Sequence, residues 1–246
     1  MQRFLVRIIC CFIPNRNLRR LVRKCRFGHY KISGKNNVIY FDKIVVPRWL
    51  VIAGLKITIN GNNNKIHIGK NCRFINSTFV IGNNDTEIKI SDNCLLQGIF
   101  ARLSYGENQQ LTIGENSIMY GANIILDENS SIKIGSDCLF ANNVSIWGAD
   151  GHSVIDKQTQ EIINCVSGPL IIGNKCWIGQ GVRILKKAHI LSNTIIGGGS
   201  VVGRRFLTEY TVIAGNPAQV IRENVTWDIR NPIFLKKHIK ENKNEK

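Results

Sequence analysis

The chain has 246 residues, of which 43% are hydrophobic and 20% charged, and it carries a formal net charge of +16 at pH 7. This length allows one large domain or two small ones, and no apolar run approaches the roughly 18 residues that a membrane-spanning helix needs. The apolar run from Ile8 to Ile13 is too short for a signal peptide, so we expect a cytoplasmic protein.

Residues 1–45 are predicted to form a basic, partly helical segment. Ten arginines and lysines precede the first acidic residue, Asp42, and account for +10 of the +16 net charge. Apolar residues at helical spacing run through the same segment: Phe4, Leu5, Ile8, Ile9 and Phe12. Such a segment could make a peripheral contact with the inner face of an anionic membrane, hold an acidic substrate, or pack on the neighbouring domain. No recognition motif supports nucleic acid as a partner.

Residues 46–222 are repetitive, and the clearest repeat has a period of six. Aliphatic residues stand six apart without a miss at Ile172, Ile178, Ile184, Ile190, Ile196 and Val202. A helix would repeat its apolar face about every 3.6 residues and a strand every second residue. A period of six instead predicts short straight runs joined by corners, with three runs in a turn of about 18 residues. We therefore predict an all-β solenoid, a parallel β-helix, whose earlier turns are anchored by Ile68, Ile90, Ile113 and Ile134.

The position four residues after each anchor holds a small side chain, as a narrow three-walled core requires. Four of the eight cysteines occupy this small position, which predicts buried, reduced thiols: Cys72, Cys94, Cys138 and Cys176. Phe206 breaks the pattern and is expected to mark the end of the regular repeat. Residues 223–246 are predicted to form a short basic helix and a tail.

The repeat is interrupted once. Counting in sixes from Ile134 predicts inward residues at Phe140, Ile146 and then His152, after which the aliphatic register resumes only at Ile172. We therefore expect a loop over residues 150–169 that leaves the solenoid, and such insertions frequently carry the binding site. A histidine with an ordinary pKa of about 6.5 is suited to act as a general base at neutral pH.

The stretch from Gly168 to Ile221 resembles the hexapeptide-repeat acyltransferases, and in particular the branch of galactoside, maltose, nodulation-factor and capsule O-acetyltransferases. The matching motifs are Cys176-Trp177-Ile178-Gly179, Ile196-Gly197-Gly198-Gly199-Ser200-Val201-Val202 and Val212-Ile213-Ala214-Gly215-Asn216-Pro217-Ala218. The loop sequence Asp150-Gly151-His152-Ser153-Val154-Ile155-Asp156 is similar to the active-site loop of that branch. The resemblance implies a left-handed β-helix, a homotrimer with each active site between neighbouring solenoids, and acetyl-CoA lying along the groove.

The resemblance also implies roles for individual residues. His152 would be the general base, Asp150 or Asp156 would orient its ring, and Trp177 would position donor or acceptor. The cofactor side is expected to comprise a backbone N–H near Gly179, close approach at Gly197 and Gly198, phosphate contacts from Arg204 and Arg205, and Pro217. We place Asn143, Trp147 and Asp156 on the acceptor side. A structural Trp177 and a solvated Arg204–Arg205 pair are the alternatives.

These observations predict an acetyl-CoA-dependent O-acetyltransferase that acts without a metal on a sugar hydroxyl of a bacterial surface polysaccharide, capsule or lipopolysaccharide, or its precursor. The first alternative is an N-acyltransferase acting on a nucleotide-linked amino sugar. A non-catalytic β-helix that binds ice, a sugar or a partner is the second, although no threonine ladder is present. A zinc-dependent carbonic anhydrase would need three metal-binding histidines, and His152 and His189 are the only pair in the relevant region.

Overall fold

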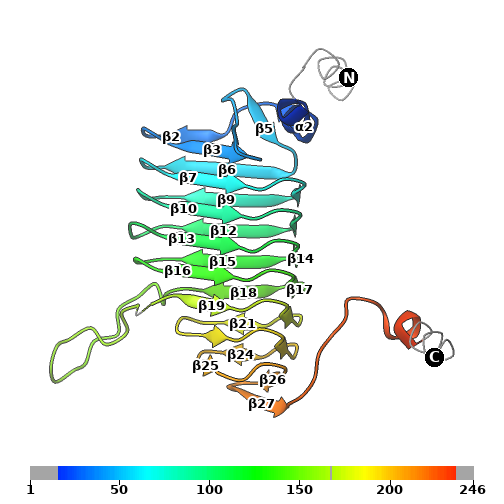
Figure 1. Cartoon of the computed structure of the whole chain (residues 1–246). Helices are drawn as coiled ribbons and strands as arrows, with labels where there is room; N and C mark the ends of the chain where they lie inside the picture. The colour runs from blue at the N-terminus through cyan, green and yellow to red at the C-terminus, as the bar shows by residue number, and fades with distance from the viewer. Residues whose placement is uncertain (1–15, 167, 237–246) are drawn as a thin grey trace.

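The computed structural model describes residues 16–166 and 168–236 and shows a left-handed parallel β-helix, drawn in Figure 1 as a stack of short strands. Three sheets form the walls of the solenoid, and their strands run parallel except for one antiparallel strand at the end of each of two sheets. The all-β fold class expected from the six-residue period is therefore confirmed. The left hand, which the family resemblance implied, runs against the usual preference for right-handed crossovers.

We number the walls in the order in which the chain crosses them. Wall I contains β2 (Lys31–Ser33), β6 (Leu55–Asn60), β9 (Ser77–Ile81), β12 (Ile99–Leu103), β15 (Ala122–Leu126), β18 (Val144–Trp147), β21 (Arg183–Ile184) and β24 (Val201–Val202). Wall II contains β3 (Val38–Phe41), β4 (Ile44–Val45), β7 (Lys65–Ile68), β10 (Glu87–Ile90), β13 (Gln110–Ile113), β16 (Ser131–Ile134), β19 (Leu170–Ile172), β22 (His189–Ile190) and β25 (Arg205–Phe206). Wall III contains β8 (Arg73–Ile75), β11 (Leu95–Gln97), β14 (Ile118–Met119), β17 (Leu139–Phe140), β20 (Trp177–Ile178), β23 (Ile195–Ile196), β26 (Val212–Gly215) and β27 (Ala218–Arg222).

Additional elements lie at the two ends of the solenoid. Helix α2 (Arg16–Lys24) leads into β1 (Cys25–Phe27), which pairs antiparallel with β5 (Leu50–Ile52). At the other end, residues 232–236 are helical. No helix among the described residues has the length and apolar character needed to cross a bilayer.

The parallel sheets begin earlier than residue 46, where we expected the solenoid to start. Strands β2 and β3 already run parallel to β6 and β7. The cause is visible in the segment 38–41, where Ile39 and Phe41 alternate inward as two residues do in each of β7, β10, β13, β16 and β19. Within the described part of the segment before residue 46, α2 is the only helix, and the apolar helical face predicted for residues 4–12 lies outside the described residues.

The predicted anchors point into the core as the period requires. Each of the six residues from Ile172 to Val202 that stand six apart is at most 1% exposed. Inward residues stack in register up wall II: Phe41, Ile68, Ile90, Ile113, Ile134, Ile172, Ile190 and Phe206. Burial of one such aliphatic side chain contributes roughly 1.5–3 kcal/mol, so the stacked columns hold the solenoid together.

The regular step of six ends at Phe206, as expected, but the solenoid continues beyond it. Phe206 pairs with Ile190 and is buried, so it is an inward anchor. It arrives two residues earlier than the period requires, because the corner after β24 is shorter than the corners before it. The chain then continues along wall III as β26, which pairs in parallel with β23.

The four cysteines at small positions are buried free thiols, as predicted, and each sulfur donates to a main-chain carbonyl of the next coil: Cys72 to Ser91, Cys94 to Gly114, Cys138 to Gly173 and Cys176 to Leu191. The corners between walls II and III carry a ladder of side-chain amides. Asn71 donates to Asn93 (3.0 Å), Asn93 to Asn116 (3.2 Å), and Asn116 to Asp137 (3.1 Å). All four have a positive φ, which Asn and Asp tolerate better than most residues.

Candidate active site

The interruption in the repeat becomes an arm, which we define as residues 148–169. The chain leaves wall I after Trp147 and rejoins wall II at Leu170, and Figure 1 shows the segment between them projecting from the side of the solenoid. A bridge between Ile155 and Ile162 closes the arm into a hairpin. His152 is exposed on the outgoing side, near the base of the arm.

Asn164 and Lys186 tie the two sides of the arm together at its base. The side-chain amide of Asn164 donates to Asp150 Oδ2 (2.7 Å) and to the carbonyl of His152 (2.8 Å), and its oxygen accepts from the backbone N–H of Val154 (2.8 Å). Lys186 Nζ lies 2.5 Å from Asp150 Oδ2 and also donates to the carbonyl of Asn164. The backbone of His152 is therefore fixed to the solenoid through three side chains. We call this set of contacts the arm tie.

Asp150 is engaged in the arm tie and makes no hydrogen bond to the ring of His152. Partial burial by itself would raise the pKa of Asp150, but hydrogen bonds from Lys186 and Asn164, with the positive charge of Lys186, bring it below its ordinary value. Asp156, the other carboxylate expected to orient the ring, accepts 2.8 Å hydrogen bonds from the N–H groups of Gln158 and Thr159 and shapes the tip of the arm. Within the described residues, neither carboxylate reaches the His152 ring.

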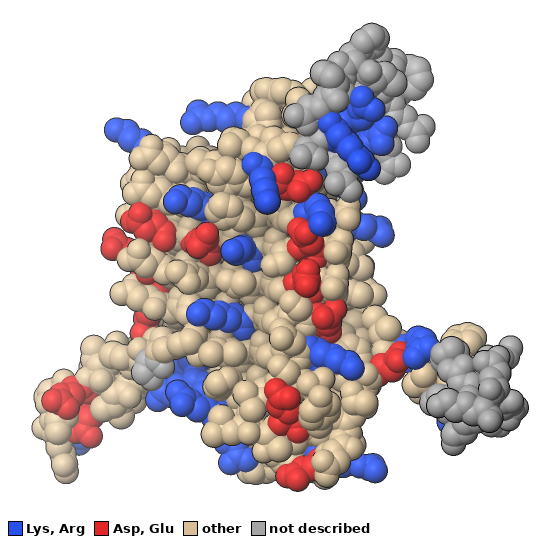
Figure 2. All heavy atoms as spheres, viewed as in Figure 1, with Lys and Arg blue, Asp and Glu red and all other residues tan. Residues whose placement is uncertain are grey.

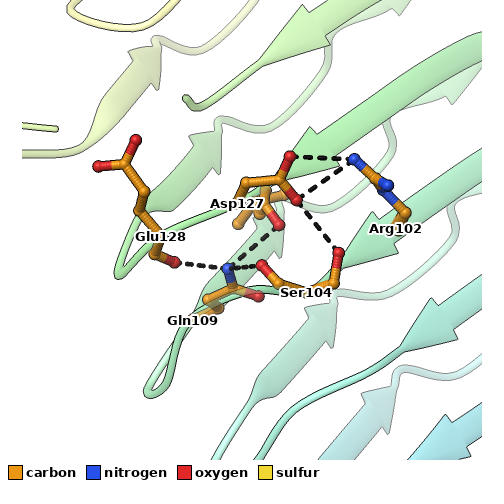
Figure 3. A network of polar contacts seen from close by, with 6 residues as sticks. Arg102, Ser104, Gln109, Asp127 and Glu128 are labelled. Atoms are coloured by element: carbon orange, nitrogen blue, oxygen red, sulfur yellow. Dashed lines mark hydrogen bonds and ion pairs between the residues drawn. The ribbon is translucent and has the colours of Figure 1, made fainter. Parts of the chain in front are cut away.

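A partly buried polar network, drawn in Figure 3, lies next to the base of the arm. Arg102 Nη2 on β12 lies 3.0 and 3.3 Å from the two carboxylate oxygens of Asp127, and Ser104 Oγ donates to the same carboxylate at 3.1 Å. The Asp127 side chain is 7% exposed. A Cβ placed on Gly151 would lie 3.8 Å from Asp127 Oδ2, so this carboxylate lies close to the residue that precedes His152.

The returning side of the arm is held by Glu128, the residue that follows Asp127. Glu128 Oε2 accepts a 3.1 Å hydrogen bond from the backbone N–H of Val166. The backbone carbonyl of Glu128 in turn accepts from the side-chain amide of Gln109, as Figure 3 shows. Both sides of the arm therefore rest on the corner that follows β15.

Basic side chains gather along the corner between walls I and II, which we call the basic edge. Lys186 and Lys187 stand in the coil after the arm, and Arg204 and Arg205 stand one coil further. Figure 2 shows this concentration of positive charge just below the base of the arm. Arg204 donates to Gln219 Oε1, and its guanidinium lies 5.0 Å from the centroid of the Phe206 ring, whereas Arg205 is exposed on β25.

The glycines expected on the cofactor side lie along a different corner, between walls III and I, which we call the glycine edge. A Cβ on Gly179 would lie 2.6 Å from the backbone nitrogen of Gly198, so this glycine allows neighbouring coils to stack. Gly197 is similarly confined by Ala214, at 2.9 Å. Gly198 is exposed, and Pro217 stands on the next coil in the turn between β26 and β27, after a cis peptide bond.

The two tryptophans of interest lie on different walls. Trp147, at the end of β18 on wall I, directly precedes the arm and is exposed, as is Asn143 in the turn before the same strand. Trp177 points outward from wall III, with its ring centroid 6.2 Å from that of Trp227. The structure therefore brings His152, Asp150, Trp147 and the arginines to one side of the solenoid and leaves Trp177 and the glycine edge on another.

Sequence reasoning missed the residues that hold the arm. Lys186, Asn164, Arg102 and Asp127 occupy no position that the repeat marks, and their partners come from other coils or from the far side of the arm. A lone charged residue on an otherwise apolar strand, as at Arg102, was the one available signal. The described residues contain no group of three or more His, Cys, Asp or Glu side chains placed to hold a metal ion.

Comparisons with known proteins agree with this architecture. The pattern of the bacterial transferase hexapeptide family (six repeats) matches residues 169–204. A polysialic acid O-acetyltransferase of Neisseria meningitidis is 33% identical over 198 residues, which are 80% of this chain and 88% of that protein. The galactoside O-acetyltransferase of Escherichia coli strain K12 is 35% identical over 120 residues, 49% of this chain and 56% of that protein. The crystal structure of the polysialic acid O-acetyltransferase OatWY matches with a TM-score of 0.71 at 26% identity, covering 87% of this chain and 97% of that one.

Proposed function

Because the chain belongs to the hexapeptide-repeat acyltransferases and is an O-acetyltransferase, we propose that it transfers the acetyl group of acetyl-CoA to a sugar hydroxyl of a bacterial surface polysaccharide, capsule or lipopolysaccharide, or its precursor. The observation that carries the proposal is the placement of His152: the repeat breaks at this residue, and the arm tie fixes its backbone while its ring stays exposed. Polysialic acid is the acceptor named for the Neisseria meningitidis relative, which supports a polymeric, acidic acceptor here.

In the proposed reaction His152 acts as the general base. Its ring accepts the proton of the acceptor hydroxyl as the oxygen attacks the thioester carbonyl, and the new ester bond forms. The carbon–sulfur bond breaks, and CoA leaves as a thiolate that takes up the proton from the imidazolium. The pKa of Asp150 lies below its ordinary value, and its carboxylate serves the reaction by holding the arm through Lys186. A general base in this position typically contributes ~10²–10⁴-fold to the rate.

We further propose that the active site is composite and forms in a homotrimer. His152 lies on one side of the solenoid and the glycine edge on another, so one copy alone does not join them. Wall III carries an outward column of apolar residues in register, and such a face is stabilised by burial against a second copy: Leu95, Ile118, Leu139, Trp177, Ile195 and Val212. Trp177 of one protomer would then face the arm of its neighbour.

Acetyl-CoA fits the two edges that such an assembly would bring together. At the glycine edge Gly198 is exposed, and a Cβ on Gly199 would meet nothing within 4 Å, so bare backbone is open to an extended ligand. At the basic edge Arg204 and Arg205 offer guanidinium groups that suit phosphates. The proposal places the enzyme in the cytoplasm.

The decisive experiment measures CoA release with a panel of acceptors: bacterial surface saccharides, including polysialic acid, and a nucleotide-linked amino sugar. His152→Ala should lower kcat by about a hundredfold or more without changing the assembly state, whereas the control His67→Ala, at a half-buried site on wall II, should keep full activity. Undiminished turnover by His152→Ala would remove this residue from the mechanism. Transfer to the amino sugar alone would replace O-acetylation by N-acylation.

A further inference from the structure

The N-terminal end of the solenoid presents exposed apolar side chains where the described coils begin. The rings of Phe27 and Trp49 stack, with centroids 5.9 Å apart and planes inclined by 23°. Phe27 is 41% exposed, Trp49 is 51% exposed, and Val45 is 54% exposed. Three exposed apolar residues at one end of a soluble fold indicate a contact surface rather than a random surface composition. We call these residues the aromatic tip.

Positive charge surrounds the aromatic tip. Between residues 16 and 50 the chain has ten arginines and lysines and a single acidic residue, Asp42. Arg26 and Arg48, which flank the stacked rings in sequence, are exposed and have no ion-pair partner among the described residues. Helix α2 buries Leu21 and Val22 and leaves Arg16 and Arg23 exposed, and Figure 2 shows positive side chains at this end of the molecule.

A hollow of about 420 Å³ adjoins the aromatic tip, and its lining includes Tyr30, Ile32, Val38, Pro47 and Arg48. Several polar groups in this hollow already make hydrogen bonds within the protein. The Tyr30 hydroxyl accepts from the N–H of Ile52 (2.6 Å), and His29 Nδ1 lies 2.9 Å from the carbonyl of Arg48.

Asn37 also lines the hollow, and its side-chain amide group and oxygen both make hydrogen bonds within the protein. Its amide group donates to the carbonyls of Ser33 and Gly61, and its oxygen accepts from Asn64. The hollow therefore offers apolar walls and the cation of Arg48. A saccharide needs several unused hydrogen-bonding groups, whereas an apolar chain with an anionic headgroup needs what this hollow provides.

We propose that the aromatic tip and the arginines around it dock the enzyme on an anionic lipid bilayer. Tryptophan and other aromatic rings favour the headgroup region of a membrane, and lysine and arginine side chains close to an anionic leaflet add electrostatic attraction. The inference goes beyond acetyl transfer, because it concerns the end of the solenoid that carries none of the proposed site residues.

Docking through the aromatic tip would set the distance between the membrane surface and the arm. Five coil spacings separate β3 from β19 on wall II, which at about 4.8 Å each is about 24 Å along the solenoid axis. A bilayer-docked enzyme would therefore hold His152 well above the headgroups. A saccharide that extends from the membrane reaches this height, whereas a sugar at the membrane surface does not.

The test uses the full-length protein and sedimentation with two kinds of vesicle, phosphatidylcholine alone and an equimolar mixture with phosphatidylglycerol. We expect binding to the anionic vesicles only. Arg26→Glu with Arg48→Glu should lower the partition coefficient by about tenfold or more, and Phe27→Ser with Trp49→Ser should also weaken binding. The matched control is Lys133→Glu, a charge reversal at an exposed site on wall II, which should bind like the wild type.

Acetyl transfer to a soluble acceptor is measured in parallel, so that failure of docking and failure of the proposed function are distinguished. All variants change exposed residues, and thermal unfolding checks that each is folded. Absence of binding to anionic vesicles, or equal binding by both double variants and the wild type, would overturn the proposal. Loss of affinity for soluble polysialic acid with unchanged vesicle binding would make this surface a polysaccharide site instead.

Discussion

Two regions of the solenoid build their coils from strands and corners of different length. In the tight coils, from β20 to β25, every strand has two residues and each corner is short. In the long coils, wall I strands such as β6, β9, β12 and β15 have five or six residues, and extra residues fill the corners. The tight coils carry Trp177, the glycine edge and the basic edge, whereas the long coils supply Asp127 and Glu128 beneath the arm.

The comparison of tight and long coils shows how far a coil can depart from the six-residue repeat. Backbone stacks directly on backbone in both regions, as Gly179 does on Gly198 in a tight coil and Gly61 does on Asn83 in a long coil. The longer corners between walls I and II are closed by side-chain amides, since Asn64 donates to the carbonyl of Asn83 and Asn83 donates to Gln109 Oε1. The family pattern matches residues 169–204, which lie mainly in the tight coils.

The largest expected effect tests whether the two regions share one cooperative core. Ile124 in a long coil and Ile184 in a tight coil are both fully buried. Changing either to alanine should lower the free energy of unfolding by about 2–5 kcal/mol, measured by urea denaturation with circular dichroism. Similar losses in a single transition indicate one core. Two separate transitions, each moved by only one of the variants, would show that the tight coils unfold by themselves.

The next effect concerns the arm tie, where the two regions meet. Asp150→Asn and Lys186→Met should each lower kcat by about tenfold, since displacement of a catalytic group by even about 1 Å is costly. The free energy of unfolding should change by less than about 1 kcal/mol, because the pair is partly exposed. Lys133→Met is the control. Normal kcat in both arm-tie variants would show that the arm keeps its position without them.

The arm tie also predicts a pH dependence. Because the pKa of Asp150 is lowered in the folded protein, its contribution is complete above the ordinary pKa of aspartate, about 3.9, and is lost as the pH falls through the folded value. Hydrogen exchange at the Val154 amide should therefore be slower in the wild type than in Asp150→Asn at neutral pH. The difference should vanish only in acid, and a difference that vanishes near neutral pH would contradict the lowered pKa.

A smaller effect distinguishes the basic edge of the tight coils from the charges of the long coils. Arg204→Ala with Arg205→Ala should raise KM for acetyl-CoA several-fold with little change in kcat, because phosphate contacts bind ground state and transition state alike. Lys89→Ala with Lys133→Ala, which removes two positive charges from wall II of the long coils, is the matched control. An equal rise in KM in both double variants would indicate a general charge effect instead of a phosphate site.

The smallest expected effect concerns the chemical labelling of cysteines, which should follow the same pattern in the tight coils and the long coils. Burial raises the pKa of the Cys25 thiol to about 12, and the cysteines at small positions are also buried. Among the described cysteines only Cys165, on the arm, is exposed. Brief treatment with iodoacetamide and peptide mapping should therefore modify Cys165 and spare Cys72, Cys94, Cys138 and Cys176. Rapid modification of the cysteines in one region alone would reveal local opening of its coils.

The sequence predicted some parts of this protein better than others. The strict period located the inward anchors from Ile172 to Val202, and the break in it located the arm. The start of the sheets at β2 was mispredicted, and the pairing of Phe206 with Ile190 was not predicted, because shorter or longer corners shift the count without disturbing the hydrogen-bonded register between coils. The roles of His152, Trp177 and the two arginines stay predictions.

The sequence by itself determined the solenoid, its buried columns and the single point at which the wall opens, since a repeat of six fixes which side chains face inward. Only the tertiary structure decided what surrounds that opening. The pairing of Asp150 with Lys186 and Asn164, and of Arg102 with Asp127, joins residues that lie 14 to 36 positions apart. Contacts of this kind depend on how coils stack and where the arm folds back, and no local pattern encodes either.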